Sequence, residues 1–139
     1  MIAVTGATSG SPADIAYGQI TTDTMSSTEV QVAYASDTEA IVRAYFEDIP
    51  VMIQVARCES TFRHTLSDGS VLKGKVDPAD TGVMQINKRY HLETAEKLGL
   101  DLENIYDNMA YARYLYEKQG TQPWSASSPC WGRTLAANV

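Results

Sequence analysis

The feature that most restricts the fold is a pair of adjacent helical patterns separated by a proline. In the first pattern the apolar residues share one helix face: Ile41, Val42, Tyr45, Phe46 and Ile49. Pro50 ends this helix and can open a second one at its first position. We expect the second helix over about 51–59, with Glu59 in its last turn. A glutamate at the end of an apolar helix can be half-buried and keep its proton near neutral pH, as a general acid must.

Length and charge limit the classes of protein to consider. A chain of 139 residues is long enough for one domain with its own core. The formal net charge of −6 argues against a nucleic-acid-binding protein, which needs a basic face. The same charge predicts no general attraction to anionic polymers, so any glycan site should be local and mostly uncharged. No run approaches the ~18 apolar residues that a membrane-spanning helix needs.

The composition divides the chain into three parts. Residues 1–35 are rich in Ser, Thr, Ala and Gly, which predicts a flexible segment without a packed core. A folded domain is expected over 36–132, opening with a capping box between Ser36 and Glu39, and 133–139 are expected to form a frayed tail. The N-terminus lacks the basic and apolar regions of a signal peptide. The protein is therefore expected to be either cytoplasmic or the mature form of an exported protein.

One less regular region follows the second helix. The turn residues at 67–70 and the apolar stretch 71–76 predict a small β-hairpin, with a short strand over 71–76, or an irregular lobe. Gly82 permits a tight approach of the backbone, and a short helix is expected over 83–87.

The rest of the domain is expected to be helical. Two longer helices are predicted over about 91–98 and 103–119, ended by Gly99 and Gly120. The segment 123–131 can form at most a turn or two of helix. The predicted fold class is therefore mainly α, of the α+β type.

Short motifs in this chain follow a known family pattern. Cys-Glu-Ser at 58–60, followed by Gly-Val-Met-Gln at 82–85, resembles the Glu-Ser and Gly-Leu-Met-Gln motifs of soluble lytic transglycosylase domains, which have a lysozyme-like fold. The run Gln-Gly-Thr-Gln-Pro-Trp at 119–124, ahead of Cys130, resembles the C-terminal end of resuscitation-promoting factor domains. The resemblance covers about residues 40–132. It implies a lysozyme-like domain with a small β-hairpin or irregular lobe after the catalytic helix.

The resemblance also implies a reaction. A lytic transglycosylase cleaves the β-1,4 bond between N-acetylmuramic acid and N-acetylglucosamine in peptidoglycan. Its single glutamate, here Glu59, protonates the leaving oxygen and then takes the proton of the sugar 6-hydroxyl, which gives a 1,6-anhydro product. Glycoside hydrolysis usually needs two carboxylates, and the candidates for a second are Asp68, Asp77 and Asp80. The alternatives are a hydrolytic lysozyme using Glu59 and one aspartate, a non-catalytic glycan-binding or signalling module, and a partner within a secretion apparatus.

The resemblance suggests which side chains contact the substrate. The expected substrate-binding residues are Ser60, Met84, Gln85, Asn87, Tyr114 and Trp124. Met84 is equally well explained as a core residue, and Tyr114 is one of four tyrosines in its predicted helix that can face the cleft. The indole of Trp124 suits the C–H face of a sugar, and its N–H can bond a hydroxyl. Trp131 is expected to cover the neighbouring cysteine. His64 and His91 are expected on the surface, and neither a metal site nor a cofactor is expected.

Cys58 and Cys130 are the only cysteines of the chain. By themselves they favour free thiols in a cytosolic protein. The resemblance instead implies a disulfide, because in resuscitation-promoting factor domains the cysteine just before the catalytic glutamate pairs with one in the C-terminal region. Disulfides persist in oxidising compartments. We therefore expect a secreted or cell-envelope protein, a monomer whose partner is the glycan strand of peptidoglycan.

Overall fold

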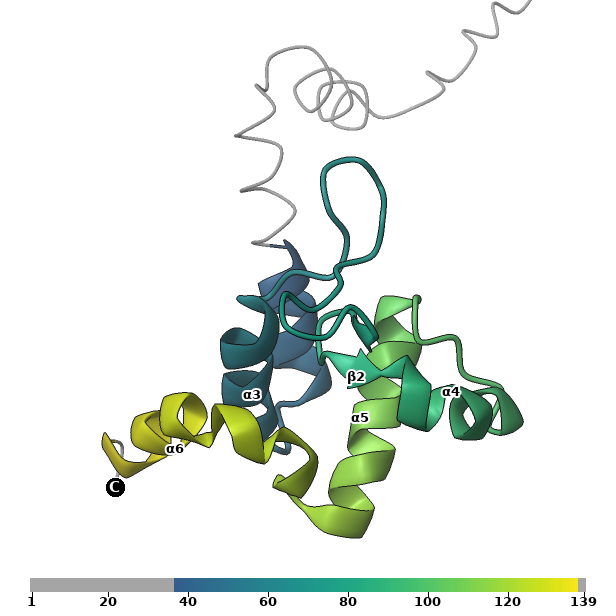
Figure 1. The fold of residues 1–139 in the computed structure, drawn as a ribbon. Helices are drawn as coiled ribbons and strands as arrows, with labels where there is room; N and C mark the ends of the chain where they lie inside the picture. Colours follow the sequence, from purple (N-terminus) through teal and green to yellow (C-terminus); the bar gives the residue numbers. More distant parts are fainter. Residues whose placement is uncertain (1–36, 138–139) are drawn as a thin grey trace, which may run out of the picture.

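The computed structural model describes residues 37–137, with side chains through residue 133. The expected linker over 1–35 and the expected capping residue Ser36 lie outside the described residues. The described part is mainly helical and contains one small two-stranded antiparallel sheet (Figure 1). This arrangement confirms the predicted α+β class.

Two helices open the described part and are separated by a short turn. The first covers residues 37–45, and α3 covers Pro50–Ser60 with the proline at its start. Between them the Ile49 amide donates to the Phe46 carbonyl at 2.8 Å. Phe46 is fully buried, and the inward residues of α3 are buried with it: Met52, Ile53, Val55 and Ala56. The predicted break between two helices at Pro50 is confirmed.

The region after α3 is an irregular lobe, seen as the long loop at the top of Figure 1. Two isolated bridges hold it, one from Thr65 to Val71 and one from Lys73 to Thr81. Val76 is 99% exposed, which a strand packed on the domain would not allow. The irregular lobe is therefore confirmed, whereas the strand predicted over 71–76 is wrong.

A small sheet follows the lobe. Strands β1 (Asp80–Thr81) and β2 (Ile86–Asn87) pair antiparallel. The chain between them makes a tight turn with positive φ at Gly82 and Gln85, 75° and 50°. A left-handed residue cannot continue a right-handed helix, so the chain enters β2 instead. The short helix predicted over 83–87 is wrong for this reason.

Two longer helices, α4 (Lys88–Lys97) and α5 (Ile105–Gln119), confirm the predicted pair. Helix α4 begins earlier than predicted because the side chain of Asn87 caps it, and Asn104 caps α5 in the same way. Both helices end before the predicted glycines, which have φ of 74° and 61°: Gly99 and Gly120.

The C-terminal segment is more helical than predicted. A 3-10 helix, η1 (Gln122–Ser127), leads directly into α6 (Ser128–Ala137). The prediction of at most a turn or two of helix is wrong, because α6 lies against α3 and is stabilised by those contacts (Figure 1). The helix also continues past residue 133, where a frayed tail was expected.

The core lies between α3, α5 and the turn that joins the two strands. Its largest fully buried side chains include Tyr111, Phe46, Met52, Met84 and Leu102. Trp124 of η1 is also buried, and its indole N–H donates to the Met84 carbonyl at 2.9 Å. This bond ties the C-terminal segment to the turn between the strands. Within residues 37–137, no helix is long and apolar enough to cross a membrane.

Candidate active site

Glu59 lies in the last turn of α3, at the wall of a cavity. The helix ends where Thr61 adopts a left-handed conformation with φ of 51°. Ser60 is buried beside it, and its hydroxyl donates to the Ala56 carbonyl at 3.0 Å. The carboxyl of Glu59 is half-buried and borders a cavity of about 370 Å³. The half-buried position expected from the sequence is therefore observed.

The C-terminal segment holds the Glu59 carboxyl in place. Ser127 Oγ donates to Glu59 Oε1 at 2.5 Å, although 68 positions separate the two residues. Ser127 Oγ also lies 3.1 Å from the Trp124 carbonyl oxygen, and Trp131 Nε1 donates to both oxygens at 3.1 Å. The single hydroxyl proton of Ser127 thus has two acceptors and can turn to the carbonyl when Glu59 is protonated. Our sequence reasoning missed Ser127, because no local pattern marks it.

Three influences set the pKa of Glu59, and their net effect raises it above its ordinary value. Burial is the largest and raises the pKa, because a charged carboxylate loses solvation there. The hydrogen bond from Ser127 lowers the pKa, and the negative charge of Asp80 raises it. A carboxyl with a raised pKa keeps its proton at higher pH, which is what a general acid requires.

Two cavities adjoin, since Asp80 and Gln85 line both of them, and we call the pair the groove. The first, of about 370 Å³, contains Glu59, and the second, of about 320 Å³, extends past the sheet to η1. Residues from three helices line the second cavity, among them Tyr90, His91, Gln119 and Trp124. An open groove with polar and aromatic walls suits a chain of sugars.

Of the three aspartates considered as a second carboxylate, only Asp80 borders the Glu59 cavity. Asp68 lies on the exposed lobe and is hydrogen-bonded within its own turn. Asp77 forms an ion pair with Arg89 at 3.0 Å. The structure therefore leaves one candidate, which the sequence did not distinguish from the other two.

Asn108 fixes the turn that carries Gln85. Its Oδ1 accepts from the Met84 amide at 3.0 Å, and its Nδ2 donates to the Thr81 and Leu102 carbonyls at 3.0 and 2.8 Å. Asn108 is fully buried. The bonds to Thr81 and Met84 tie the turn to α5, and the bond to Leu102 ties α5 to the segment before it.

His64 also supports this turn, and it is buried rather than on the surface as predicted. Its Nδ1 accepts from the Val83 amide at 3.0 Å, and its Nε2 donates to the Glu103 carbonyl at 2.7 Å. Only the neutral ring with its proton on Nε2 satisfies both partners. Burial lowers the pKa of His64, which favours that neutral form. A Cβ on Gly82 would lie 2.7 Å from the His64 ring and 2.6 Å from Asn108, so only glycine fits there.

Four of the six residues expected to bind substrate line the groove: Ser60, Gln85, Asn87 and Trp124. Gln85 borders both cavities, and its Nε2 donates to the Gly82 carbonyl at 2.9 Å. Asn87 lines the second cavity, although its amide donates to Asp77 and Asp80 at 2.9 Å. Trp124 lines it too, but it is only 3% exposed and its N–H is bonded to a backbone carbonyl, so it does not offer the predicted donor.

Ser60 borders the first cavity but, like Met84 and Tyr114, offers little side-chain surface to a ligand in either cavity. The side chain of Met84 is fully buried, as its alternative assignment to the core predicts, and Ser60 is 2% exposed. Tyr114 is partly buried under Lys118, whose Nζ lies 4.9 Å from the ring centre, and it lines neither of the two cavities. Tyr90, which the sequence reasoning missed, borders the second cavity and is 73% exposed.

His91 also differs from its predicted surface position. It is partly buried beside the second cavity, with Nδ1 3.0 Å from the Tyr111 hydroxyl. Among residues 37–137, no three His, Cys, Asp or Glu side chains are grouped so that they could hold a metal ion.

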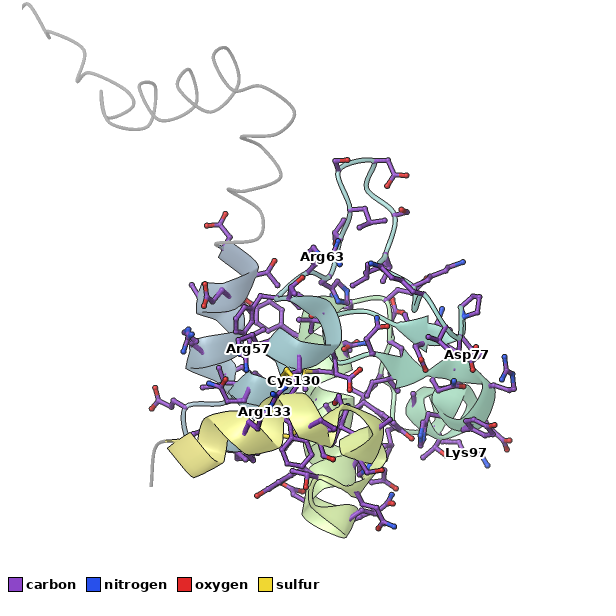
Figure 2. All side chains as sticks on the ribbon, turned by 60° about the vertical axis from the view of Figure 1, so that its left-hand side comes forward. Arg57, Arg63, Asp77, Lys97, Cys130 and Arg133 are labelled. Atoms are coloured by element: carbon purple, nitrogen blue, oxygen red, sulfur yellow. A yellow bond between two sulfur atoms is a disulfide. The ribbon has the colours of Figure 1, made fainter. Side chains whose placement is uncertain are left out.

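The predicted disulfide between Cys58 and Cys130 is confirmed. Its Cα atoms are 6.0 Å apart, and it joins α3 to α6, as the yellow bond at the Cys130 label of Figure 2 shows. Cys58 directly precedes Glu59 in the sequence. Cys130 lies three residues after Ser127, so the bond holds the serine hydroxyl close to the carboxyl. Trp131, expected to cover the disulfide, donates to Ser127. A disulfide is consistent with an extracellular or cell-envelope location.

Comparison of the chain with protein-family models, with curated proteins and with solved structures found no match. The function is therefore inferred from the geometry of the groove and from the motifs on its two walls.

Proposed function

We propose that this protein is a peptidoglycan lytic transglycosylase with a lysozyme-like fold, which cleaves the β-1,4 bond between N-acetylmuramic acid and N-acetylglucosamine. The proposal depends above all on Glu59, a half-buried carboxyl with a raised pKa at the wall of an open groove. The two sequence motifs support it, because Cys-Glu-Ser at 58–60 and Gly-Val-Met-Gln at 82–85 both contribute to the first cavity.

The proposed reaction uses Glu59 twice. Its proton goes to the glycosidic oxygen while the bond from that oxygen to the anomeric carbon breaks. The N-acetyl group of the substrate stabilises the developing positive charge. The Glu59 carboxylate, now hydrogen-bonded by Ser127, takes the proton of the 6-hydroxyl as that oxygen bonds to the anomeric carbon. The product is a 1,6-anhydro sugar, and Glu59 regains its proton without consuming water.

Hydrolysis is the second candidate, and Asp80 favours it. Asp80 borders the same cavity, and its charge raises the pKa of Glu59. A carboxylate in this position can activate a water molecule or act as the nucleophile of a two-carboxylate mechanism. The two candidates share Glu59 as the acid and differ in what attacks the anomeric carbon.

Digestion of a defined peptidoglycan followed by mass analysis of the fragments separates these candidates. Transglycosylation gives fragments lighter by one water than hydrolysis does. Asp80→Asn should largely abolish cleavage by a hydrolase but should leave the acid of a transglycosylase in place. Strand binding without any cleavage by the wild-type protein would instead indicate a glycan-binding or signalling module.

We further propose that the protein acts as a monomer in the cell envelope or outside the cell, where glycan strands are accessible. The disulfide supports this location. Intact-mass analysis of protein from its native source, after thiol alkylation under denaturing conditions, tests it. Two labels without prior reduction would contradict it.

A further inference from the structure

We propose that the lobe side of the Glu59 cavity binds the carboxylates of the peptide stem on the muramic sugar, through Arg63, Lys73 and Lys75. This inference rests on the proposed function and specifies its substrate class: glycan strands that still carry their stems. All three cationic side chains border the cavity of about 370 Å³ that contains Glu59. We call this set the cationic rim.

The charge of the groove is strongly asymmetric. The chain has a net charge of −6, yet the first cavity combines the three cations of the cationic rim with two carboxyl groups, Glu59 and Asp80. When Glu59 is protonated, as the acid must be, three positive charges face one negative charge. The described residues that line the second cavity include no lysine or arginine. The expectation of a mostly uncharged site therefore does not hold at this end of the groove.

The cationic rim is not used in the ion pairs that the structure describes. Within residues 37–133, five ion pairs occupy other cations: Arg43, Lys88, Arg89, Lys97 and Arg113. Side chains of the cationic rim take part in none of these pairs. They are solvent-exposed at the cavity edge and thus accessible to a ligand.

Arg63 is held in position by the unusual backbone before it. Thr61 and Phe62 both have positive φ, 51° and 58°, which side chains of their kind rarely adopt. Such backbone persists where the surrounding structure enforces it, and it concentrates at functional sites. Arg63 Nε donates to the Ser60 carbonyl and to Thr61 Oγ1 at 3.1 Å. Its two Nη groups can then face a carboxylate, for which a guanidinium is the matching fork. Figure 2 shows Arg63 at the base of the lobe.

Lys73 and Lys75 are anchored through their backbone. Between them, the Gly74 amide donates to the Asp80 carbonyl at 2.8 Å, and Lys73 bridges Thr81. A Cβ on Gly74 would lie 2.4 Å from the Asp77 carbonyl oxygen, so the backbone is pressed against the next segment of the lobe. The two flanking lysines therefore stay at the cavity edge while their long side chains remain free to adapt.

Peptide-stem carboxylates fit this arrangement better than other wall anions. The stem is attached to the muramic sugar, which is the sugar whose bond Glu59 must reach. Its carboxylates therefore arrive at the first cavity with the reacting bond, whereas phosphates of a separate polymer do not. Wall phosphate is the competing source of negative charge, and the experiment below distinguishes the two.

The test compares Lys73→Gln/Lys75→Gln with Lys97→Gln/Lys118→Gln, which removes the same charge elsewhere; Figure 2 shows Lys97 far from Arg63. Each variant digests glycan strands with stems and the same strands after an amidase has removed the stems. We expect KM on stem-bearing strands to rise about three- to tenfold for the first variant only, with kcat little changed. The rise should shrink as salt increases. Removal of the stem leaves one lactyl carboxylate on each muramic sugar, so on stripped strands the rise for the first variant should be clearly smaller, and the second variant should match the wild type.

An unchanged KM on stem-bearing strands, or an equal rise on stripped strands, would overturn the inference. So would a dependence on wall phosphate instead of stems, seen with strands that carry one and lack the other. Arg63→Gln provides a second variant, with its melting temperature checked first because Arg63 also bonds the backbone.

A binding measurement separates this inference from the proposed reaction. A soluble disaccharide-peptide is titrated into Glu59→Gln protein, with and without the two lysine substitutions. Stem-dependent binding by the Glu59→Gln protein, together with no cleavage of any strand by the wild type, would refute the reaction and keep the stem site. Cleavage that ignores the stem, with no effect of the lysines on binding, would keep the reaction and refute the site.

Discussion

Two polar side chains near the turn between the strands differ in how fully they are bonded: Glu59, which shares a cavity with Gln85, and Asn108, which accepts from the Met84 amide. Asn108 is fully buried and makes three hydrogen bonds to backbone groups. Glu59 is half-buried, borders a cavity and receives one hydrogen bond from Ser127. A buried group with all its partners stabilises one structure, whereas a partly desolvated group with few partners can exchange its proton. The first therefore positions the site, and the second is suited to chemistry.

The comparison predicts opposite costs on substitution. Removing a satisfied buried group leaves its partners without hydrogen bonds and lowers the free energy of unfolding. Removing a carboxyl with a raised pKa costs little stability, because its environment already disfavours the charge.

Glu59→Gln should lower cleavage of peptidoglycan by about 10²–10⁴-fold, the usual contribution of general acid–base catalysis. The fold should persist, because glutamine can still accept from Ser127. The folded protein holds the Glu59 proton more tightly than the unfolded chain does, since burial raises the pKa. Stability from this group is therefore present at low pH and is lost as pH rises through the raised pKa.

Melting curves measured across pH test this predicted loss of stability, because the glutamine of the variant does not titrate. The variant should lose less stability than the wild type as pH rises through the window above the ordinary carboxyl pKa. A folded variant with near-native cleavage would refute the role of Glu59.

Breaking the disulfide should have the next largest effect. Cys58 and Cys130 are 72 positions apart, and closing a loop of this size stabilises a fold by about 4 kcal/mol at most. Cys130→Ser should lower the denaturant midpoint accordingly. Cleavage should fall further than stability alone explains, since α6 would no longer hold Ser127 at Glu59. Equal activity of reduced and oxidised protein, at a temperature where both are folded, would contradict this link.

Asn108→Ala should destabilise the fold by roughly 2–3 kcal/mol, because it leaves buried backbone groups unpaired. The matched control is Asn104→Ala, which removes an exposed helix cap and should cost only about 1 kcal/mol. Urea titration measures both. If the two substitutions cost the same, the turn before Gln85 does not depend on Asn108.

Ser127→Ala should have the smallest effect on rate but a specific effect on pH dependence. The hydrogen bond from Ser127 lowers the pKa of Glu59, so its loss raises that pKa further. The acid then keeps its proton to higher pH, so the alkaline limb of the kcat/KM profile should shift toward higher pH. Ser127→Thr should retain the wild-type profile, and exposed Ser125→Ala serves as the control. A profile that does not move would show that Ser127 only fills space.

The sequence predicted most of what depends on near neighbours. The helix break at Pro50 and the stops at Gly99 and Gly120 are confirmed, because proline and glycine act on their own backbone. The half-buried position of Glu59 also followed from the apolar pattern of its helix. The pairing of Cys58 with Cys130 came from a family resemblance and not from the spacing of the residues.

Other features depended on contacts between distant segments, and only the tertiary structure decided them. The turn at 82–85 replaces a predicted helix because Asn108 and His64 bind its backbone from 24 and 19 positions away. Helix α6 forms where the sequence predicted little helix, because it packs on α3. Contacts between distant segments also bring the Ser127 hydroxyl to Glu59 and bring Lys73 and Lys75 to the edge of the Glu59 cavity. Local sequence preference does not encode such contacts, because their free energy is gained only when distant segments meet in the folded chain.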